Sequence, residues 1–127
     1  MNDTIAALMT REILTIGMDD SVAQVEAALA DRGLSWAPVL EPGGAVVGVI
    51  SSADLLQFHA QQRDPRSVRA WQLCTYKPIS VDQTTPIGDV ARTMVEQRIH
   101  HVVVTDGARP VGVVSSLDFV RAYVERS

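Results

Sequence analysis

Apolar and polar positions along the chain follow the same order twice, and the most regular part of that order is a nine-residue phrase. The phrase reads VGVISSADL at residues 47–55 and VGVVSSLDF at residues 111–119. Each copy begins with β-branched residues, which favour a strand, and continues into Ser-x-x-Asp, which favours the start of a helix. Because Asp54 and Asp118 lie about half the chain apart, the sequence predicts an internal duplication.

The first copy of the pattern predicts a strand, a helix, two strands and a second helix. Val22, Val25 and Leu29 recur at steps of three and four, which places them on one face of a helix. Asp20 or Ser21 is its predicted cap. The predicted elements are, in order, a lead-in at 4–9, a strand at 13–16, a helix ending at 33, strands at 34–40 and 45–50 around a hairpin loop, and a helix at 51–62.

The second copy repeats this order after a polar stretch. Thr85 is predicted to cap its first helix, with Pro86 at the first helical position. Strands at 79–81, 99–105 and 110–114 and a closing helix at 119–126 complete the copy. We therefore divide the chain into a first repeat at 1–62, a connector at 63–72 and a second repeat at 73–127. One repeat alone would expose a large apolar sheet face. The predicted fold is therefore mixed α/β (α+β), with two β-α-β-β-α repeats packed about a pseudo-twofold axis.

Composition narrows the classes of protein to which the chain can belong. The chain has 127 residues, 46% of them hydrophobic, a formal net charge of −4 and a pI of about 5.2. This balance argues against DNA and anionic membrane surfaces as partners. No apolar run approaches the length of a membrane span, and the N-terminus does not resemble a signal peptide. The single cysteine, Cys74, excludes an intrachain disulfide, is expected to be a small buried residue, and fits the predicted cytoplasmic location.

The repeated phrases resemble a tandem pair of CBS domains, named for cystathionine β-synthase. The matching phrases in the first half are Met9-Thr10 before residues 13–16, the stretch 37–40, and residues 48–55, each with a counterpart in the second half. The resemblance covers essentially the whole chain. It implies a regulatory module that binds an adenosine-containing ligand, such as AMP, ADP, ATP or S-adenosylmethionine, in clefts between the repeats. It also implies a homodimer and, as a partner, a regulated enzyme or transporter.

The resemblance assigns the ligand site to the Ser-x-x-Asp helix starts and to strand residues of the opposite repeat. In the family the matching aspartate holds ribose, and the serine lies beside it. The expected clefts group Ser115 and Asp118 with Thr15, Asp20, Leu34, Ser35 and Trp36, and Ser51 and Asp54 with Ser80, Thr85, Ile99, His100 and His101.

Each of these residues also has a purely structural interpretation. Ser-x-x-Asp is a capping box, so both aspartates can serve only to cap helices. Thr15, Ser80 and Thr85 are equally typical of strand edges and caps, and Trp36 fits the core as well as it fits stacking on a base.

His100 and His101 are the main difference between the halves. One can face solvent while the other packs, or the pair can contact phosphate. A metal pair is not expected, because adjacent strand residues point to opposite faces. In some members of the family a His-Arg pair at the matching place meets phosphates, and here His101 replaces the arginine. Any phosphate binding is therefore expected to weaken as pH rises.

No catalytic set is present in the sequence. It contains no P-loop, no G-x-S-x-G and no H-E-x-x-H motif. We therefore expect a protein that is not an enzyme and requires no cofactor, with an adenine nucleotide as its regulatory ligand. The alternative hypothesis is a ligandless CBS fold that serves for dimerisation and protein interaction.

Overall fold

The structure, a computed structural model, describes residues 3–76 and 80–126 and divides the chain into two compact units. Unit 1 comprises residues 1–13 and 79–127, and unit 2 comprises residues 14–78. Each unit has its own sheet, its own helices and its own apolar core. The mixed α/β class predicted from the sequence is confirmed.

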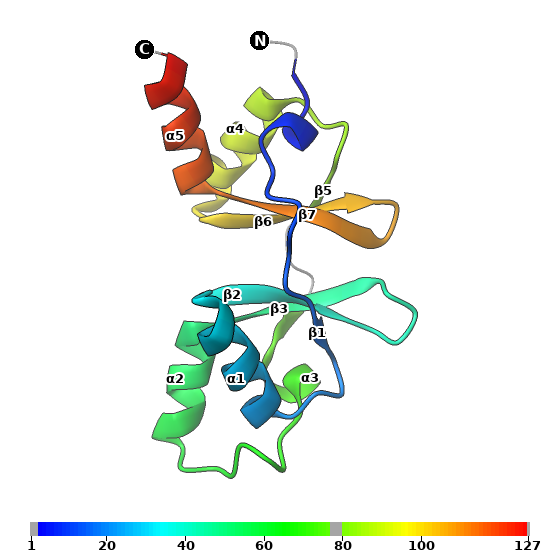
Figure 1. The fold of residues 1–127 in the computed structure, drawn as a ribbon, viewed down its shortest axis with the longest axis vertical. Coiled ribbons are helices and arrows are strands. Elements are labelled where there is room, and N and C mark those ends of the chain that lie inside the picture. Colours follow the sequence, from blue (N-terminus) through cyan, green and yellow to red (C-terminus); the bar gives the residue numbers. More distant parts are fainter. Residues whose placement is uncertain (1–2, 77–79, 127) are drawn as a thin grey trace. The chain divides into compact units, whose positions relative to one another are not determined.

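Unit 2 is a four-stranded sheet with helices packed on it (Figure 1). The strand order is β1-β2-β3-β4, with β1 parallel to β2 and the other pairs antiparallel. The elements are β1 (Ile16–Gly17), α1 (Val22–Arg32), β2 (Trp36–Leu40), β3 (Val46–Ser51), α2 (Ser52–Ala60), α3 (Ala70–Leu73) and β4 (Thr75–Tyr76).

Unit 1 repeats this plan with the second half of the chain. Its sheet has the order β5-β6-β7, again with a parallel pair followed by an antiparallel hairpin. Even the register shift in the hairpin is repeated, between Val39 and Leu40 in one unit and between Val104 and Thr105 in the other. The elements are η1 (Ile5–Ala7), β5 (Ser80–Asp82), α4 (Ile87–Gln97), β6 (His101–Asp106), β7 (Arg109–Ser115) and α5 (Ser116–Arg126). Residue 79 of the predicted strand 79–81 lies outside the described residues.

Helix α1 forms where the sequence predicts it. The backbone N–H of Gln24 donates to the Ser21 hydroxyl at 3.1 Å, and the Ser21 N–H donates to the Gln24 side chain at 2.8 Å. This reciprocal pair satisfies backbone groups that have no partner inside the helix. Val22 and Val25 are fully buried, and Gly33 ends the helix at a φ of 63°. The amphipathic face, the cap and the stop are therefore all confirmed.

Helix α4 starts differently from the prediction. The helix begins at Ile87 with Pro86 as its N-cap, so Thr85 is not the cap. The N-terminal segment takes over that role, because the Ile87 N–H donates to the Asp3 carbonyl at 3.1 Å. The Ile5 N–H in turn donates to the Thr85 carbonyl at 2.8 Å. A distant backbone segment thus replaces the side-chain cap that local sequence suggests.

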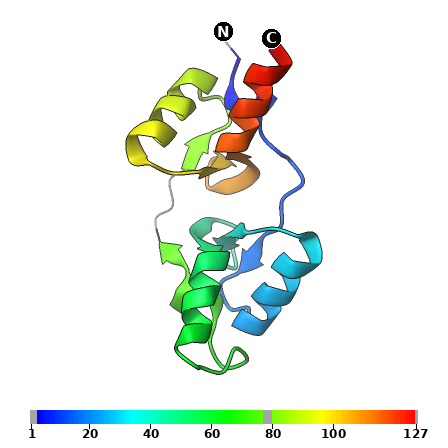
Figure 2. The same ribbon diagram turned by 90° about the vertical axis from the view of Figure 1, so that its left-hand side faces the viewer.

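Each lead-in segment completes the sheet built by the other half of the sequence. Thr10 pairs with Val113 in unit 1, with N–H···O distances of 2.8 and 3.0 Å, while Thr75 pairs with Val49 in unit 2. Ile5 is fully buried in the core of unit 1. Figure 2 shows the N-terminal segment beside the helices of that unit. Each compact unit therefore contains the lead-in segment of the other half of the chain, whereas each sequence repeat begins with its own lead-in segment.

The segment predicted as a connector is partly built into unit 2. Val68 and Ala70 are buried in its core, and helix α3 follows directly. The Ala70 N–H donates to the Asp20 carbonyl at 2.8 Å. The polar residues around Pro65 predicted a solvent-exposed linker. The buried side chains of Val68 and Ala70 instead attach this stretch to the core of unit 2.

Candidate functional site

The two Ser-x-x-Asp phrases form the same hydrogen-bonded helix start in both units. In unit 2 the Ser51 N–H and hydroxyl donate to Asp54 Oδ2 at 2.8 and 3.0 Å, and the Asp54 N–H donates to the Ser51 hydroxyl at 3.3 Å. In unit 1 the equivalent distances for Ser115 and Asp118 are 2.7, 3.1 and 3.3 Å. Both aspartates therefore cap their helices, as the structural interpretation predicts, and their role in ligand binding stays a prediction.

At both aspartates, the cap uses one carboxylate oxygen and leaves the other available for a further hydrogen bond. Both donors from each serine converge on Oδ2, so the cap does not need the second carboxylate oxygen. Asp54 and Asp118 are half-buried, which keeps part of each carboxylate accessible. A half-exposed carboxylate at a helix N-terminus can accept further hydrogen bonds from hydroxyl groups, while the helix N–H groups favour anions.

A strand start lies directly beside each helix start. Trp36 pairs with Ser51 across β2 and β3, and the Ser52 N–H donates to the Ser35 carbonyl at 2.7 Å. We call Ser35, Trp36, Ser51 and Asp54 the unit-2 corner.

The other unit has a corner of the same construction. His101 pairs with Ser115 across β6 and β7, and the Ser116 N–H donates to the His100 carbonyl at 2.9 Å. We call His100, His101, Ser115 and Asp118 the unit-1 corner. Apart from the serine and the aspartate, the two corners differ in their strand residues.

The sequence did not predict that His101 lies near Asp118, because the resemblance groups the site residues across the repeats. An antiparallel hairpin brings the start of its first strand to the end of its second. The short turn between Asp106 and Arg109 was the available signal, because it fixes the register that sets His101 opposite Ser115. The groupings across the two units stay predictions.

The charge state of the unit-1 corner depends in part on His101. Burial lowers the pKa of His101, and the neighbouring His100 lowers it further, while the Asp118 carboxylate acts in the opposite direction. Because the net effect lowers the pKa below the ordinary value near 6.5, His101 is neutral at pH 7. His101, the first residue of β6, and His100 before it both keep part of their surface exposed, so the burial that lowers the pKa of His101 is partial.

The remaining predicted site residues lie around these corners or in turns. Thr15 and Ser80 are exposed, at or just before the first strand of each unit, and Leu34 is 43% exposed beside Ser35. Ile99, beside His100, packs against the core of unit 1, which favours its structural role.

Asp20 and Thr85 occupy turns. The Asp20 carboxylate accepts the Gly17 N–H at 2.9 Å, and the Thr85 N–H donates to the Asp82 carbonyl at 3.0 Å. Both residues are half-buried. The Asp20 carboxylate and the Thr85 backbone N–H therefore each stabilise a turn. Contacts of these two residues with a ligand stay predictions.

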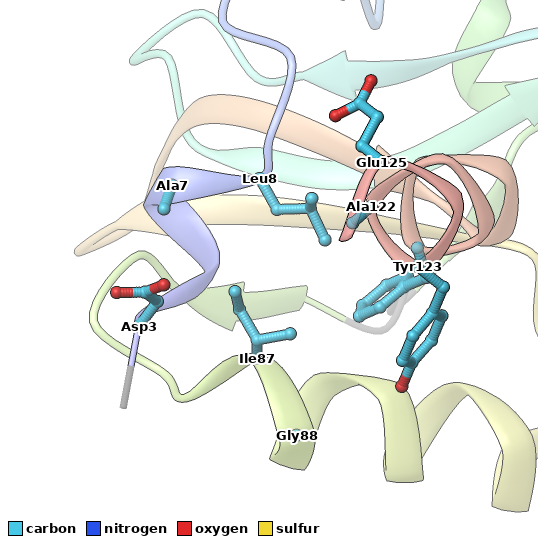
Figure 3. Close-up of a pocket in the computed structure, with 9 residues that line it drawn as sticks. Asp3, Ala7, Leu8, Ile87, Gly88, Ala122, Tyr123 and Glu125 are labelled. Atoms are coloured by element: carbon cyan, nitrogen blue, oxygen red, sulfur yellow. The ribbon is translucent and has the colours of Figure 1, made fainter. Parts of the chain in front are cut away.

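Unit 1 also contains an open pocket of about 540 Å³ between η1, α4 and α5 (Figure 3). Leu8, Ile87 and Tyr123 reach towards it from these three segments. Its walls are mostly apolar, and Asp3 and Glu125 lie at its rim. The pocket is a hollow in the helical face of the unit and does not include the residues of the unit-1 corner.

We also considered metal binding, a reactive thiol and a membrane span in the part of the chain that the structure describes. Within residues 3–76 and 80–126, no three His, Cys, Asp or Glu side chains gather as a metal site. Cys74 is buried as predicted, and burial raises the pKa of its thiol, which disfavours the reactive thiolate. Among the described residues, no helix combines the length and apolarity of a membrane span.

Comparison with known proteins gives a consistent result for both halves. The family model for the CBS domain matches residues 5–60 and 69–125. Uncharacterized protein MJ1404 of Methanocaldococcus jannaschii is 29% identical over 95% of the chain and 32% of the relative. The 5′-AMP-activated protein kinase subunit gamma-3 of Sus scrofa is 30% identical over 74% of the chain and 20% of the relative. The chain therefore spans about a third or less of these two relatives.

Solved structures show the same fold. The CBS domain pair of protein MJ0100, in complex with 5′-methylthioadenosine and S-adenosyl-L-methionine, matches with a TM-score of 0.87 and 23% identity over 100% of both chains. The structure of CBSX2 in complex with AMP matches with a TM-score of 0.83 and 23% identity over 98% of both chains. Both resemblances are strong in fold and low in sequence.

Proposed function

The chain belongs to the CBS domain family, and from that premise we propose that it is a non-catalytic regulatory module that binds an adenosine-containing ligand. The observation that carries this proposal is the pair of matching helix starts, in which Asp54 and Asp118 each have a carboxylate oxygen that the cap does not need. Two proteins of the same fold are seen with AMP or with S-adenosylmethionine and methylthioadenosine. Ligand binding would act by shifting the equilibrium between conformations of the module.

Each group at a corner has a role in this proposal. The carboxylate of Asp54 or Asp118 accepts hydrogen bonds from the two ribose hydroxyls. The helix N–H groups and the serine hydroxyl supply donors and positive potential for a phosphate. Near the strand start in unit 2, the exposed side chain of Leu34 and the half-buried side chain of Trp36 are the apolar groups proposed to contact the adenine ring. The other predicted contacts of Thr15, Asp20, Ser80, Thr85 and Ile99 stay part of the proposal.

A thermal-unfolding titration tests this function directly. AMP, ADP, ATP and S-adenosylmethionine are added separately, with cytidine monophosphate as the control that keeps ribose and phosphate. A ligand present at 100 times its Kd stabilises the folded state by about 2.7 kcal/mol, so at least one adenosine ligand is expected to raise the Tm by several degrees. If none does so at millimolar concentration, the ligandless interaction module becomes the better account.

We also propose that the module forms a homodimer through the exposed face of α5. Apolar side chains recur there at helical spacing and remain largely exposed: Leu117 at 52%, Val120 at 54%, Tyr123 at 65% and Val124 at 69%. A contiguous apolar stripe of this kind marks an interaction surface more often than a solvated one. A regulated enzyme or transporter as a further partner stays part of the proposal. A cytoplasmic location stays a prediction supported by the free thiol of Cys74.

The variant Val120→Glu tests the dimer. Placing a charge in the middle of the apolar stripe makes association unfavourable, because the carboxylate would lose its hydration in the interface. Sedimentation equilibrium should show a dimer for the unmodified chain and a monomer for the variant. Gln57→Glu adds the same charge at an exposed position of α2 and should remain dimeric. A monomeric unmodified chain would contradict the proposal.

A further inference from the structure

The open pocket of unit 1 can be compared with the same place in unit 2, because each unit holds its lead-in segment by matching hydrogen bonds. In unit 1 the Ile87 N–H donates to the Asp3 carbonyl at 3.1 Å. In unit 2 the Val22 N–H donates to the Val68 carbonyl at 2.8 Å. These residues occupy matching positions in the two copies of the sequence pattern. Each residue that lines the pocket therefore has a structural counterpart in unit 2.

The counterpart of Ala122 is Phe58, and this exchange removes an aromatic ring from unit 1. Each residue lies four positions after the aspartate of its Ser-x-x-Asp phrase, on α5 and on α2 respectively. Phe58 is fully buried in the core of unit 2, whereas Ala122 is half-buried and lines the pocket. Phe119, the counterpart of Leu55, lies in the pocket wall and leaves the pocket open. The pocket therefore opens at a position where unit 2 places a phenyl ring.

The rim of the pocket is acidic, and this feature also distinguishes unit 1 from unit 2. Asp3 lies at the rim on the lead-in segment, and Glu125 lies there on α5 (Figure 3). Their counterparts in unit 2 are the uncharged Val68 and Gln61. Within the described part of the chain, neither carboxylate has an ion pair and no basic side chain lines the pocket. Carboxylates at the mouth of an apolar pocket favour a cation over an anion.

We infer that this pocket is a second binding site, for a small organic cation that carries an aromatic ring. The ring lies against the apolar walls formed by Leu8, Ile87 and Ala122, and the cationic group lies near Asp3 and Glu125. The volume of about 540 Å³ is within the range of roughly 300–1,000 Å³ that is typical of small-molecule sites. The pocket does not include the residues of the unit-1 corner, so the inference does not depend on the proposed adenosine site.

Calorimetric titration at pH 7 with three naphthalene compounds of different charge tests the inference. The compounds are naphthylmethylammonium, the neutral naphthylmethanol and the anionic naphthylacetate, which share the same bicyclic ring. The cation is expected to bind about three- to tenfold more tightly than the neutral compound, since partly exposed ion pairs each contribute modestly. The anion is expected to bind more weakly than either. Equal affinity for all three compounds, or no binding at millimolar concentration, would overturn the inference.

Two variants that narrow the pocket establish where the compounds bind. Ala122→Phe supplies the ring that unit 2 has at the matching position, and Gly88→Leu adds bulk from α4, where a Cβ meets no heavy atom within 4 Å. Each should abolish binding of the cation. Val95→Phe adds a ring at a position of α4 that is 78% exposed and outside the pocket, and it should keep the binding. Circular dichroism and the Tm without ligand establish that each variant is folded. Unchanged binding in a folded Ala122→Phe or Gly88→Leu protein would contradict the site.

Neutralising the rim tests the selection by charge. The double variant Asp3→Asn/Glu125→Gln should bind the cation and the neutral compound with similar affinity, while the affinity for the neutral compound stays nearly unchanged. Glu96→Gln removes the same charge from an exposed position of α4 outside the pocket and should keep the preference for the cation. A preference that persists in the double variant would mean that the rim carboxylates do not select the ligand.

Two further titrations separate the pocket from the other sites proposed for the protein. Because Tyr123 belongs both to the pocket and to the exposed stripe of α5, a second copy of the chain could form part of the site. Val120→Glu disrupts the proposed dimer without altering a lining residue, and it should bind naphthylmethanol as tightly as the unmodified chain does. Loss of binding there would assign the compound to an interface between copies. Saturating AMP should not displace naphthylmethylammonium, and displacement would overturn the separate site while leaving the proposed function intact.

Discussion

Asp118→Ala and Asp54→Ala are each expected to abolish ligand binding at the corner that carries the change, and the double variant is expected to show no ligand-induced rise in Tm. Each carboxylate is proposed to accept two ribose hydroxyls. A hydrogen bond to a charged group contributes about 1.5–3 kcal/mol, so losing two should lower affinity by a factor on the order of 100 or more. Calorimetry on the single variants, at fixed pH and ionic strength, gives the affinities.

The same substitutions also remove a helix cap, which must be measured separately. Loss of a capping side chain costs about 1 kcal/mol of stability. Gln24→Ala is the matched control, because Gln24 closes the capping box of α1 and is not a proposed ligand contact. It should lower the Tm of the free protein to a similar extent and keep the full ligand response. Unchanged affinity in both aspartate variants and in their combination would leave capping as their whole role.

The features that local sequence could predict are those with local causes. The capping boxes at Ser21, Ser51 and Ser115 each involve residues three apart, and the structure has all three. The stop at Gly33 follows from the ease with which glycine adopts positive φ. Its counterpart, Arg98, ends α4 at a φ of 55° although it is not a glycine. No local sequence pattern predicts that end of the helix.

The features that the sequence did not predict depend on distant backbone. The lead-in segments read as the beginning of each repeat, but their hydrogen-bond partners lie in the other half of the sequence. The cap of α4 likewise comes from Asp3 and not from Thr85. At the site, the resemblance supplied the aspartates, whereas the hairpin register placed His101 beside Asp118. Pairings of this kind follow from chain topology, which a single sequence with a repeat leaves open.

Each lead-in segment pairs with a strand of the other half of the chain, and this pairing explains why glycine is the second residue of the repeated phrase. A methyl group on Gly48 would lie 2.6 Å from the carbonyl oxygen of Thr75, and one on Gly112 would lie 2.9 Å from that of Thr10. Both distances are below those of ordinary contacts, and backbone atoms cannot turn aside as a side-chain end can. The glycines are therefore required by the close approach of a neighbouring strand.

Gly48→Ala and Gly112→Ala are accordingly expected to destabilise the fold by about 1–3 kcal/mol each, as overpacking of a close-packed site does. Chemical denaturation followed by circular dichroism gives the loss. Gly88→Ala is the control, because no heavy atom lies within 4 Å of the added methyl group. Gly88 lies in the first turn of α4, so the added methyl group should leave the stability unchanged or raise it slightly. Hydrogen exchange locates the damage: Gly112→Ala should deprotect the amides of Thr10 and Val113, which bond to each other's carbonyls, more than those of α1. Wild-type stability in both variants would mean that the lead-in segments do not pack where the structure places them.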